Sequence, residues 1–486
     1  MKNRKQNSAK KPVKQGADAK QPEPNKISAS TPYDFKGKNL TAYGGLLPVS
    51  TMLEKLGMQA LLEELITASR IPRAMPIAKF VMAIVLSIYL GFSRLSHIRF
   101  IAKDPLLTAI LQVAKVPPQS TMWRFLASLH ITVGKQLLKL QRRLRERVWA
   151  AANVRLKTLT IDTDTTVHTL YGKQMGGRKS YNPKNKGKKS YQPILTFLNE
   201  TREYVGGQLR NGHRLTGKQI ADHLDEVFAG FAATGAKRFG RADSGFYCRE
   251  AIKAYQKWNC RFVVVARKTA ALLRQLRGAD WKPSPNSDAD AECEFRYRPD
   301  EWTQEFRFVG LRYDEVEDDE EGDEDPVEQY QLFACGKVKY RVFVTDIEDQ
   351  PADWIAWFSN QRARCENLIK ESNNDAGLTA HPSGRFATNA VHFQLAMLAY
   401  NLNCWLLLFQ RHEEETVEDL KHTMLATSRL RFLFIPAKMW KHAGRTGISY
   451  SENYEEKGLF DRLMGRLRAV VLPGERFAPV VPVALE

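Results

Sequence analysis

The sequence predicts a mixed α/β protein with a helical N-terminal region. Three observations support this fold class. Apolar residues recur at helical spacing over residues 45–150. Between residues 151 and 269, β-branched segments alternate with amphipathic ones, which is typical of a sheet covered by helices. Residues 270–345 then carry several short strand-like segments, which predict a β-rich insertion before helical spacing returns over residues 346–410.

The chain is strongly basic. Its 486 residues include 73 Lys and Arg against 54 Asp and Glu, a formal net charge of +19. Residues 314–328 hold eleven acidic side chains and no basic one, so the rest of the chain is more basic still. Such an excess favours a polyanionic partner, and nucleic acid is the usual one. A membrane surface and simple solubility are the alternatives.

The cysteines and the apolar runs argue against two classes of protein. The six cysteines are scattered without a CxxC pair, which disfavours a zinc site and a disulfide framework and favours a reducing cytoplasm. The apolar runs Phe80–Leu90 and Leu395–Phe409 are shorter than a membrane span requires. We expect both to be buried core helices, with no membrane partner.

The N-terminal part divides into an arm and a helical region. Residues 1–30 are polar and basic and predict a disordered arm, either a solubilising tail or a DNA contact. In the region 31–150, Asp104-Pro105 predicts the start of one helix, and Ser120 can cap a second that carries Arg124. Helix, short turn and capped helix resemble a helix-turn-helix, although most such pairs are only packing units.

Two carboxylates lie within the first predicted strand, Leu156–Leu170. Asp is disfavoured inside strands, yet Asp162 and Asp164 are both near its middle. Because they are two residues apart, they project from the same face. Either they meet cations, or the strand is an irregular edge strand. A hairpin of Pro193–Asn199 and Glu203–Leu209 follows.

A second candidate acid, Asp243, lies where a later strand ends. It belongs to the segment Arg-Ala-Asp-Ser-Gly-Phe, and ligands collect at strand carboxyl ends in α/β sheets. By itself, Asp243 could equally cap the next helix. The elements expected here are a helix at Leu215–Phe231, a strand at Arg238–Asp243, a helix at Cys248–Trp258 and a strand at Cys260–Ala266. Those expected in the insertion are strands at Glu292–Tyr297, Trp302–Tyr313, Gln329–Phe333 and Tyr340–Val344.

The third candidate acid lies on a long helix predicted over Asp349–Asn374. Arg362, Glu366 and Lys370 are spaced by four and share one helix face, a pattern that surface ion pairing also explains. An apolar helix up to Phe409 follows, and then residues 411–486, which we expect to be a basic and helical tail.

Together, these acids suit one chemistry. Two divalent cations about 3.5–4 Å apart can activate an attacking oxygen and stabilise a leaving oxygen in phosphodiester cleavage. Mg²⁺ takes carboxylate oxygens as ligands. An Asp from a central strand, an Asp from a strand end and a Glu from a helix can converge on such a pair.

The order of these motifs resembles that of the DDE transposases of bacterial insertion sequences. Their first acid is followed by small or hydroxyl residues, as in Asp164-Thr165-Thr166, and their second lies in a turn like Asp243–Phe246. Their third lies in a Tyr-x2-Arg-x3-Glu-x6-Lys helix, which Arg362 and Glu366 match. Ser359 replaces the Tyr and Asn373 replaces the Lys, so Lys370 is the substitute cation.

The resemblance implies an RNase H-like mixed sheet with a β-rich insertion. It implies that Asp164, Asp243 and Glu366 bind Mg²⁺, with Mn²⁺ as an alternative and Asp162 as a rival first acid. It further implies cleavage and strand transfer on double-stranded DNA, at terminal inverted repeats and target, by a homodimer in the bacterial cytoplasm. A structure-specific nuclease and a non-catalytic DNA-binding derivative are the alternatives, and the presence of all three acids weighs against the derivative.

Several basic residues are candidates for holding the DNA. Residues 172–189 carry seven basic and no acidic side chains between Tyr171 and Tyr191, which suits phosphate contacts as well as it suits a flexible charged loop. Trp281 and Trp302 of the insertion could stack on an extruded base, although core packing is the more ordinary role. The predicted DNA contacts are Arg124, Arg178, Lys179, Lys184, Lys186, Lys188, Lys189, Arg362 and Lys370.

Overall fold

The structure is a computed structural model that describes residues 27–68, 75–284, 288–314, 338–412, 415–417 and 420–471. By their contacts, residues 39–486 belong together and residues 1–38 form a second unit. Most of the predicted arm at 1–30, most of the acidic run and the strand predicted at Gln329–Phe333 lie outside the described residues.

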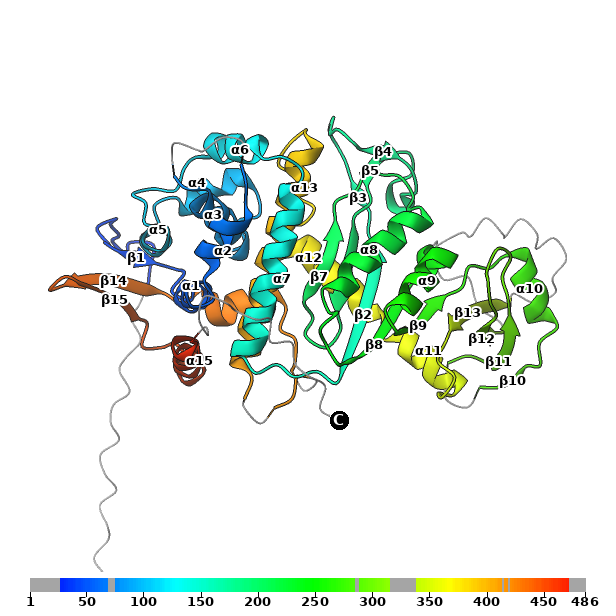
Figure 1. Ribbon diagram of the computed structural model, residues 1–486. Coiled ribbons are helices and arrows are strands. Elements are labelled where there is room, and N and C mark those ends of the chain that lie inside the picture. The colour runs from blue at the N-terminus through cyan, green and yellow to red at the C-terminus, as the bar shows by residue number, and fades with distance from the viewer. Residues whose placement is uncertain are drawn as a thin grey trace, which may run out of the picture. The chain divides into compact units, whose positions relative to one another are not determined.

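The N-terminal region is helical, as the apolar spacing predicts (Figure 1). Asp104 caps α5, its carboxylate accepting hydrogen bonds from the backbone N–H of Leu106 and Leu107 at 3.0 and 2.9 Å. The cap predicted at Ser120 is wrong. Helix α6 begins at Gln119, two residues before the start that this cap implies, and its N-cap residue is Pro118. The helices are α1 Leu46–Lys55, α2 Met58–Leu65, α3 Ile77–Tyr89, α4 Ile98–Ile101, α5 Pro105–Leu111, α6 Gln119–Ser128 and α7 Val133–Ala151.

A mixed sheet follows the helical region. In the described residues its central part has the strand order β7-β6-β2-β8-β9. Strands β2, β6 and β7 are antiparallel neighbours, whereas β8 runs parallel to β2 and β9 parallel to β8. The predicted hairpin and the two later strands are therefore confirmed. The bounds are β2 Thr158–Thr165, β6 Ile194–Leu198, β7 Tyr204–Gln208, β8 Lys237–Ala242 and β9 Cys260–Val265.

The strands of the insertion join this same sheet. Strand β13 pairs antiparallel with β9, and β12, β11 and β10 follow outward. The insertion is thus an extension of the sheet rather than a separate β layer, because the edge of β9 is open to pairing. The bounds are β10 Lys282–Pro283, β11 Ala291–Tyr297, β12 Phe306–Tyr313 and β13 Lys339–Thr345, and helix α10 spans Ala270–Arg277.

Helices cover both faces of the sheet. Thr163 and Asp162 of β2 point to opposite faces. Thr163 reaches α8 through a hydrogen-bond chain by way of Thr196 to His223. Asp162 reaches α11 through Arg241, which also bonds the backbone of that helix. Helices α8 and α11 therefore lie on opposite faces. The bounds are α8 Gly217–Ala229, α9 Arg249–Lys257, α11 Ala352–Asn360 and α12 Ala363–Asn374.

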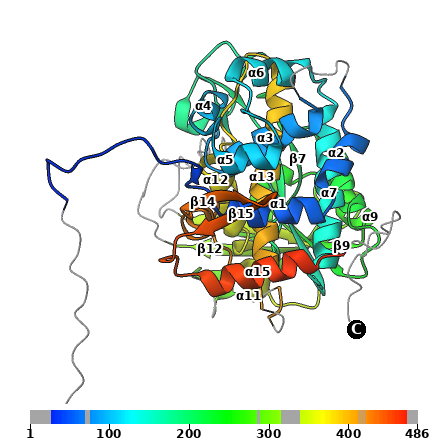
Figure 2. The same ribbon diagram turned by 90° about the vertical axis from the view of Figure 1, so that its left-hand side faces the viewer.

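Helix α13, Phe386–Gln410, joins the helical region to the sheet (Figures 1 and 2). The Asn401 amide pairs with both backbone groups of Tyr204 at 2.9 Å, and Gln394 donates to the Gly207 carbonyl at 2.8 Å. These amides satisfy the outer edge of β7, which would otherwise expose unpaired groups. Among the described helices, α13 is the one long and apolar enough to cross a membrane, and its apolar window is wholly buried by protein.

We expect a helical tail from the sequence, but the C-terminal region also contains strands. A hairpin of β14 Ala437–His442 and β15 Arg445–Tyr450 precedes helix α15 Lys457–Ala469. Strand β14 also pairs with β1, Leu40–Thr41, so the hairpin is fixed by a partner almost 400 residues earlier in the chain. A short helix, α14 Leu425–Ser428, leads into the hairpin.

Candidate functional site

The candidate site lies at the carboxyl ends of the neighbouring strands β2 and β8. The two strands are parallel, and Asp162 is in register with Arg241 and Thr163 with Ala242. The register therefore brings Asp164 next to Asp243, one residue beyond the pair of Thr163 and Ala242. Strand carboxyl ends are where α/β sheets place their ligands.

Asp162 lies inside the protein rather than at this end. Its carboxylate forms a two-pronged ion pair with Arg241, with Nε–Oδ1 at 2.6 Å and Nη2–Oδ2 at 2.7 Å. Both side chains are 2% exposed. Burial raises the pKa of Asp162, and the adjacent guanidinium opposes that shift. Because Arg241 occupies both carboxylate oxygens, the geometry favours Asp164 as the first acid of the site.

Arg241 also fixes the end of a helix. Its Nη1 donates to the carbonyl of Phe358 at 3.0 Å, and its guanidinium lies 4.8 Å from the centre of the Phe358 ring. The long helix predicted over Asp349–Asn374 is in fact two helices, α11 and α12, separated at Gln361–Arg362. The hydrogen bond from Arg241 satisfies a carbonyl that the break leaves without a helical partner.

Arg362 directly precedes α12, as its N-cap residue, and lies among the acids. Its Nη1 donates to Oδ2 of Asp164 at 2.8 Å, and its Nη2 donates to Oε1 of Glu366 at 3.0 Å. The Asp164 and Arg362 side chains are 11% and 12% exposed, whereas Glu366 in the first turn of α12 is 58% exposed. One guanidinium therefore bridges the first and third candidate acids.

The charges of the three acids act on one another. Burial, followed by the negative charge of Asp243, raises the pKa of Asp164 to about 7, and Glu366 adds to this shift. Burial would lower the pKa of Arg362, but Asp164, Asp243 and Glu366 outweigh that effect and raise it. The structure thus brings together all three acids and one predicted cation.

The second acid is held by its own turn. Asp243 directly follows β8, and its Oδ1 accepts a hydrogen bond at 3.0 Å from the backbone N–H of Gly245. A single helical turn, Ser244–Phe246, follows, so the carboxylate acts as its cap. The sequence left open that Asp243 caps the next helix, but α9 begins after Cys248, so Asp243 caps only the short turn.

These carboxylates have the donor chemistry that a hard divalent cation requires. As placed, no three His, Cys, Asp or Glu side chains in the described part of the chain could hold one ion together. A guanidinium lies between two of the acids instead. That a cation already bridges Asp164 and Glu366 is the observation that favours a cation-binding role for this cluster.

The raised pKa of Asp164 predicts a pH-dependent stability. The folded chain keeps this proton up to about pH 7, whereas an unfolded chain releases it near the ordinary value of 3.8. This group's contribution to stability is therefore full below about pH 4 and is lost as pH rises towards 7, by up to about 1.4 kcal/mol per unit. In metal-free buffer, urea unfolding of the wild type and of Asp164→Asn should show the wild type losing stability relative to the variant over this interval. A difference that stays constant with pH would contradict the shift.

The two positions that depart from the transposase-like signature lie in different surroundings. Ser359, which replaces the Tyr, is 2% exposed near the end of α11. Asn373, which replaces the Lys, has its side-chain oxygen 3.0 Å from the imidazole of His168. Burial lowers the pKa of His168 to about 3. Lys370 is exposed on α12, one turn after Glu366.

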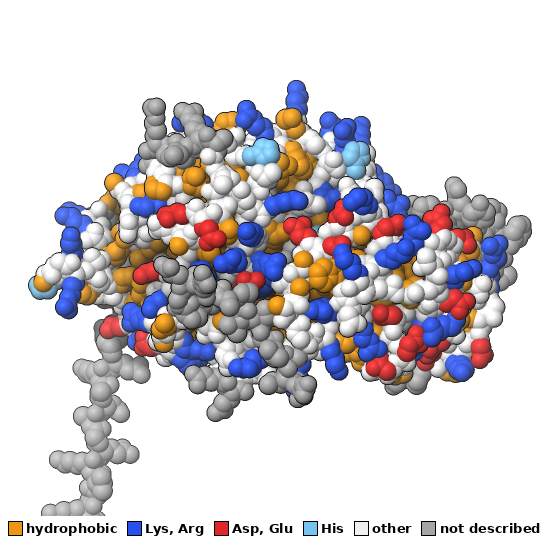
Figure 3. Space-filling model, viewed as in Figure 1, with side chains coloured by type: hydrophobic (Ala, Val, Ile, Leu, Met, Phe, Trp, Pro, Cys, Tyr) orange, Lys and Arg blue, Asp and Glu red, His pale blue; other side chains and the backbone are white. Residues whose placement is uncertain are grey.

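The basic loop forms a small sheet beside the site. Strands β3 His168–Thr169, β5 Lys189–Tyr191 and β4 Arg178–Lys179 pair antiparallel. The hydrogen bond from His168 to Asn373 ties its base to α12, the helix of the third acid. Figure 3 shows Lys and Arg side chains along the upper rim, in the region of this sheet. All six basic residues predicted here are exposed: Arg178, Lys179, Lys184, Lys186, Lys188 and Lys189.

Arg241 is the site residue that sequence reasoning missed. A signal was present, because an arginine within a strand that reads as buried requires a buried acid as its partner. The sequence separation of 79 residues between Arg241 and Asp162 hides the pairing until the strand register is known.

A family model described as the transposase DDE domain, group 1, matches residues 25–472 of the chain. The chain belongs to this family. No curated protein sequence matches it significantly. The solved structures similar to it include the piggyBac transposase synaptic complex with hairpin DNA, determined by cryo-EM. That match has 12% sequence identity and a TM-score of 0.40, and covers 89% of this chain and 86% of the other.

Other residues named by the transposase-like motifs lie apart from this cluster. Arg124 is exposed on α6, where its Nε donates to the carbonyl of Ser120. Trp281 donates to the Leu276 carbonyl at 2.8 Å, and Trp302 packs against the ring of Tyr247, with 5.2 Å between ring centres. Both tryptophans of this transposase therefore pack within the protein, as their ordinary role predicts.

Proposed function

We propose that this transposase is encoded by a bacterial insertion sequence, whose ends it cuts and joins to target DNA with a divalent metal. Asp164, Asp243 and Glu366 are the proposed catalytic acids. The observation that carries the proposal is the position of Arg362, shared between Asp164 and Glu366 within the field of Asp243. Two acids bridged by one cation, with a third acid whose charge acts on that cation, suit phosphodiester chemistry better than they suit a stable core.

The proposed cofactor is Mg²⁺, with Mn²⁺ as an alternative. When bound, it would activate the attacking oxygen and stabilise the leaving oxygen. The carboxylates of the three acids would hold it, and Asp164 would have to give up its proton. Arg362 would then give up its hydrogen bond to Asp164 or to Glu366 and bind a DNA phosphate instead. A phosphate fits the planar guanidinium as well as a carboxylate does.

We infer that the core is RNase H-like. The order β7-β6-β2-β8-β9, with three antiparallel strands followed by two parallel ones, supports this assignment. The first acid lies on the central strand, the second after its parallel neighbour and the third on a helix that packs on that strand. Strands β10–β13 would then be the insertion that separates the second acid from the third.

The proposed partner is double-stranded DNA at the terminal repeats and at the target, in the cytoplasm. The exposed cations of residues 178–189, together with Arg362 and Lys370, would hold the backbone near the site. Arg124 on α6 would contact DNA from the helical region. Because two ends must be held at once, we expect a homodimer in the DNA complex.

Strand transfer tests this function. A duplex carrying the element's end, already cut to leave a 3′-hydroxyl, is incubated with a supercoiled plasmid and Mg²⁺. We expect joined products with the wild type and none when EDTA replaces the metal. Cleavage of intact ends without joining of pre-cut ends would overturn the proposal and identify a nuclease instead.

A further inference from the structure

The β14–β15 hairpin carries positive charge that the proposed active site does not use. Residues 437–450 include Lys438, Lys441 and Arg445, together with His442, and no acidic residue. All four side chains are exposed. Within the described part of the chain, none of the four takes part in an ion pair. In Figure 3, Lys or Arg and His side chains appear at the left-hand end of the view, where Figure 1 places the hairpin.

An aromatic side chain lies flat among these charges. Trp440 pairs across the hairpin with Gly447. A Cβ at Gly447 would lie only 2.0–2.6 Å from three atoms of the indole, so the ring lies directly over the glycine. Trp440 is nevertheless 44% exposed. Lys438 and His442, two residues to either side, share its face of the strand. This face therefore offers a lysine on one side of an accessible ring and a histidine on the other.

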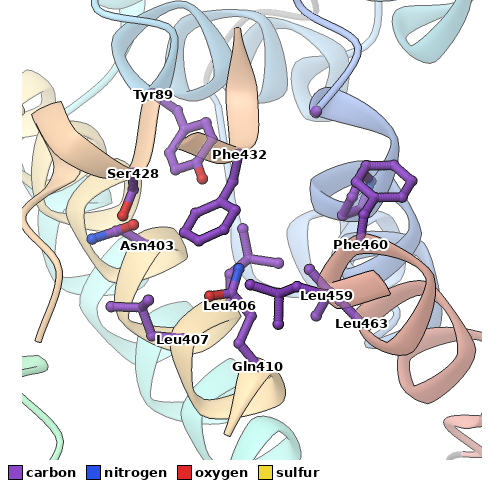
Figure 4. A pocket seen from close by; sticks show the side chains of 12 residues that line it. Tyr89, Asn403, Leu406, Leu407, Gln410, Ser428, Phe432, Leu459, Phe460 and Leu463 are labelled. Atoms are coloured by element: carbon purple, nitrogen blue, oxygen red, sulfur yellow. The ribbon is translucent and has the colours of Figure 1, made fainter. Parts of the chain in front are cut away.

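The base of the hairpin is held firmly. Strand β14 pairs with β1, and the backbone N–H of Met439 donates to the Asn39 carbonyl at 2.9 Å. The Tyr450 hydroxyl donates to the Gly44 carbonyl at 3.2 Å, and its ring packs on Phe460 of α15, with 5.0 Å between ring centres. In turn, α15 lines a small cavity with α13; the side chains seen there in Figure 4 include Leu459, Leu463, Leu406 and Leu407.

A fixed base with an exposed tip suits a rigid recognition element. A two-stranded ribbon fits the major groove of DNA, and lysine and arginine bind its phosphates without regard to sequence. An aromatic ring beside such basic side chains can pack against a sugar or base. A protein partner is a poorer fit, because charged residues are depleted from the centres of protein interfaces. The charge and shape therefore favour a nucleic acid duplex.

We propose that the β14–β15 hairpin binds duplex DNA away from the cleavage site. This proposal rests on one part of the proposed function, which is that the chain binds DNA. The hairpin belongs to the part of the molecule built from β1, α1 and α15, whereas the candidate acids lie at the far ends of β2 and β8 (Figure 1). Its role would be to bind the flank of the same duplex whose end enters the active site.

The test compares DNA binding by two double variants. Lys441→Gln with Arg445→Gln removes two cations from the hairpin, and Lys253→Gln with Lys282→Gln removes two exposed cations from α9 and β10 as the matched control. Affinity for a fluorescein-labelled duplex from the element's end is measured by anisotropy at several KCl concentrations. The logarithmic salt slope of the hairpin variant should be smaller by about 2, which is roughly 0.9 for each lost phosphate contact. The control should match the wild type.

A third variant tests the aromatic face. Gly447→Val places carbon atoms where the indole lies, and so should weaken binding several-fold without changing the salt slope. Hairpin variants that bind with the wild-type affinity and slope would overturn the proposal, and would leave an anionic protein or membrane surface as the partner. The proposed function fails separately, if the wild type binds this duplex in Mg²⁺ but neither cuts nor joins it.

Discussion

Asp162→Asn should lower the free energy of unfolding by about 3–5 kcal/mol, because it leaves a buried guanidinium without its counter-charge. Asn has nearly the shape of Asp, so the change removes charge and little volume. Arg241 would keep its hydrogen bond to Phe358 but lose the carboxylate that holds two of its nitrogen atoms. Urea unfolding in metal-free buffer measures the effect.

The control for this prediction is another acid in an ion pair. Asp222 pairs with Lys218 on the surface of α8, where the two side chains are 62% and 82% exposed. Asp222→Asn should therefore cost less than about 1 kcal/mol. The double variant Asp162→Leu with Arg241→Met removes both buried charges and should be more stable than Asp162→Asn. Equal stability of Asp162→Asn and the wild type would contradict the role of this ion pair.

Asp243→Asn should slow DNA cleavage at least about a thousandfold, because loss of a metal ligand removes several kcal/mol of transition-state stabilisation. Binding of the same duplex should persist, since the substitution removes a negative charge and no cation. Gel analysis of cleaved duplex and anisotropy of bound duplex measure the two effects separately.

An exposed acid in the insertion provides the comparison. Asp300→Asn changes the same charge at a residue outside the candidate site and should cleave at the wild-type rate. If Asp243→Asn also cleaved at that rate, Asp243 would have no part in catalysis.

Local patterns were sufficient to predict much of the fold. Segments rich in β-branched residues predicted β2, and the two short strands that follow were predicted as the hairpin of β6 and β7. The C-terminal hairpin was missed, because β14 is held by β1 and no local pattern shows a partner that distant. Likewise, the strands of the insertion were predicted individually, but only pairing between β13 and β9 places them in the main sheet.

The residues of the candidate site could be predicted from the sequence, but their contacts with one another could not. Spacing placed Asp162 and Asp164 on one strand face and could not choose between them, because the choice depends on Arg241 in a neighbouring strand. The break between α11 and α12 was hidden for the same reason. The hydrogen bond that accompanies it comes from Arg241, 117 residues before Phe358.

The most direct test of the central claim is whether the acids hold the metal that cleaves DNA. Asp243→Cys is assayed on the element's end with Mg²⁺ and with Mn²⁺. Mg²⁺ requires oxygen ligands, whereas a transition-metal ion accepts sulfur more readily. We predict that the variant is inactive in Mg²⁺ and recovers cleavage in Mn²⁺, while the wild type cuts in both. Cleavage at the wild-type rate in Mg²⁺, or no gain in Mn²⁺, would contradict the account.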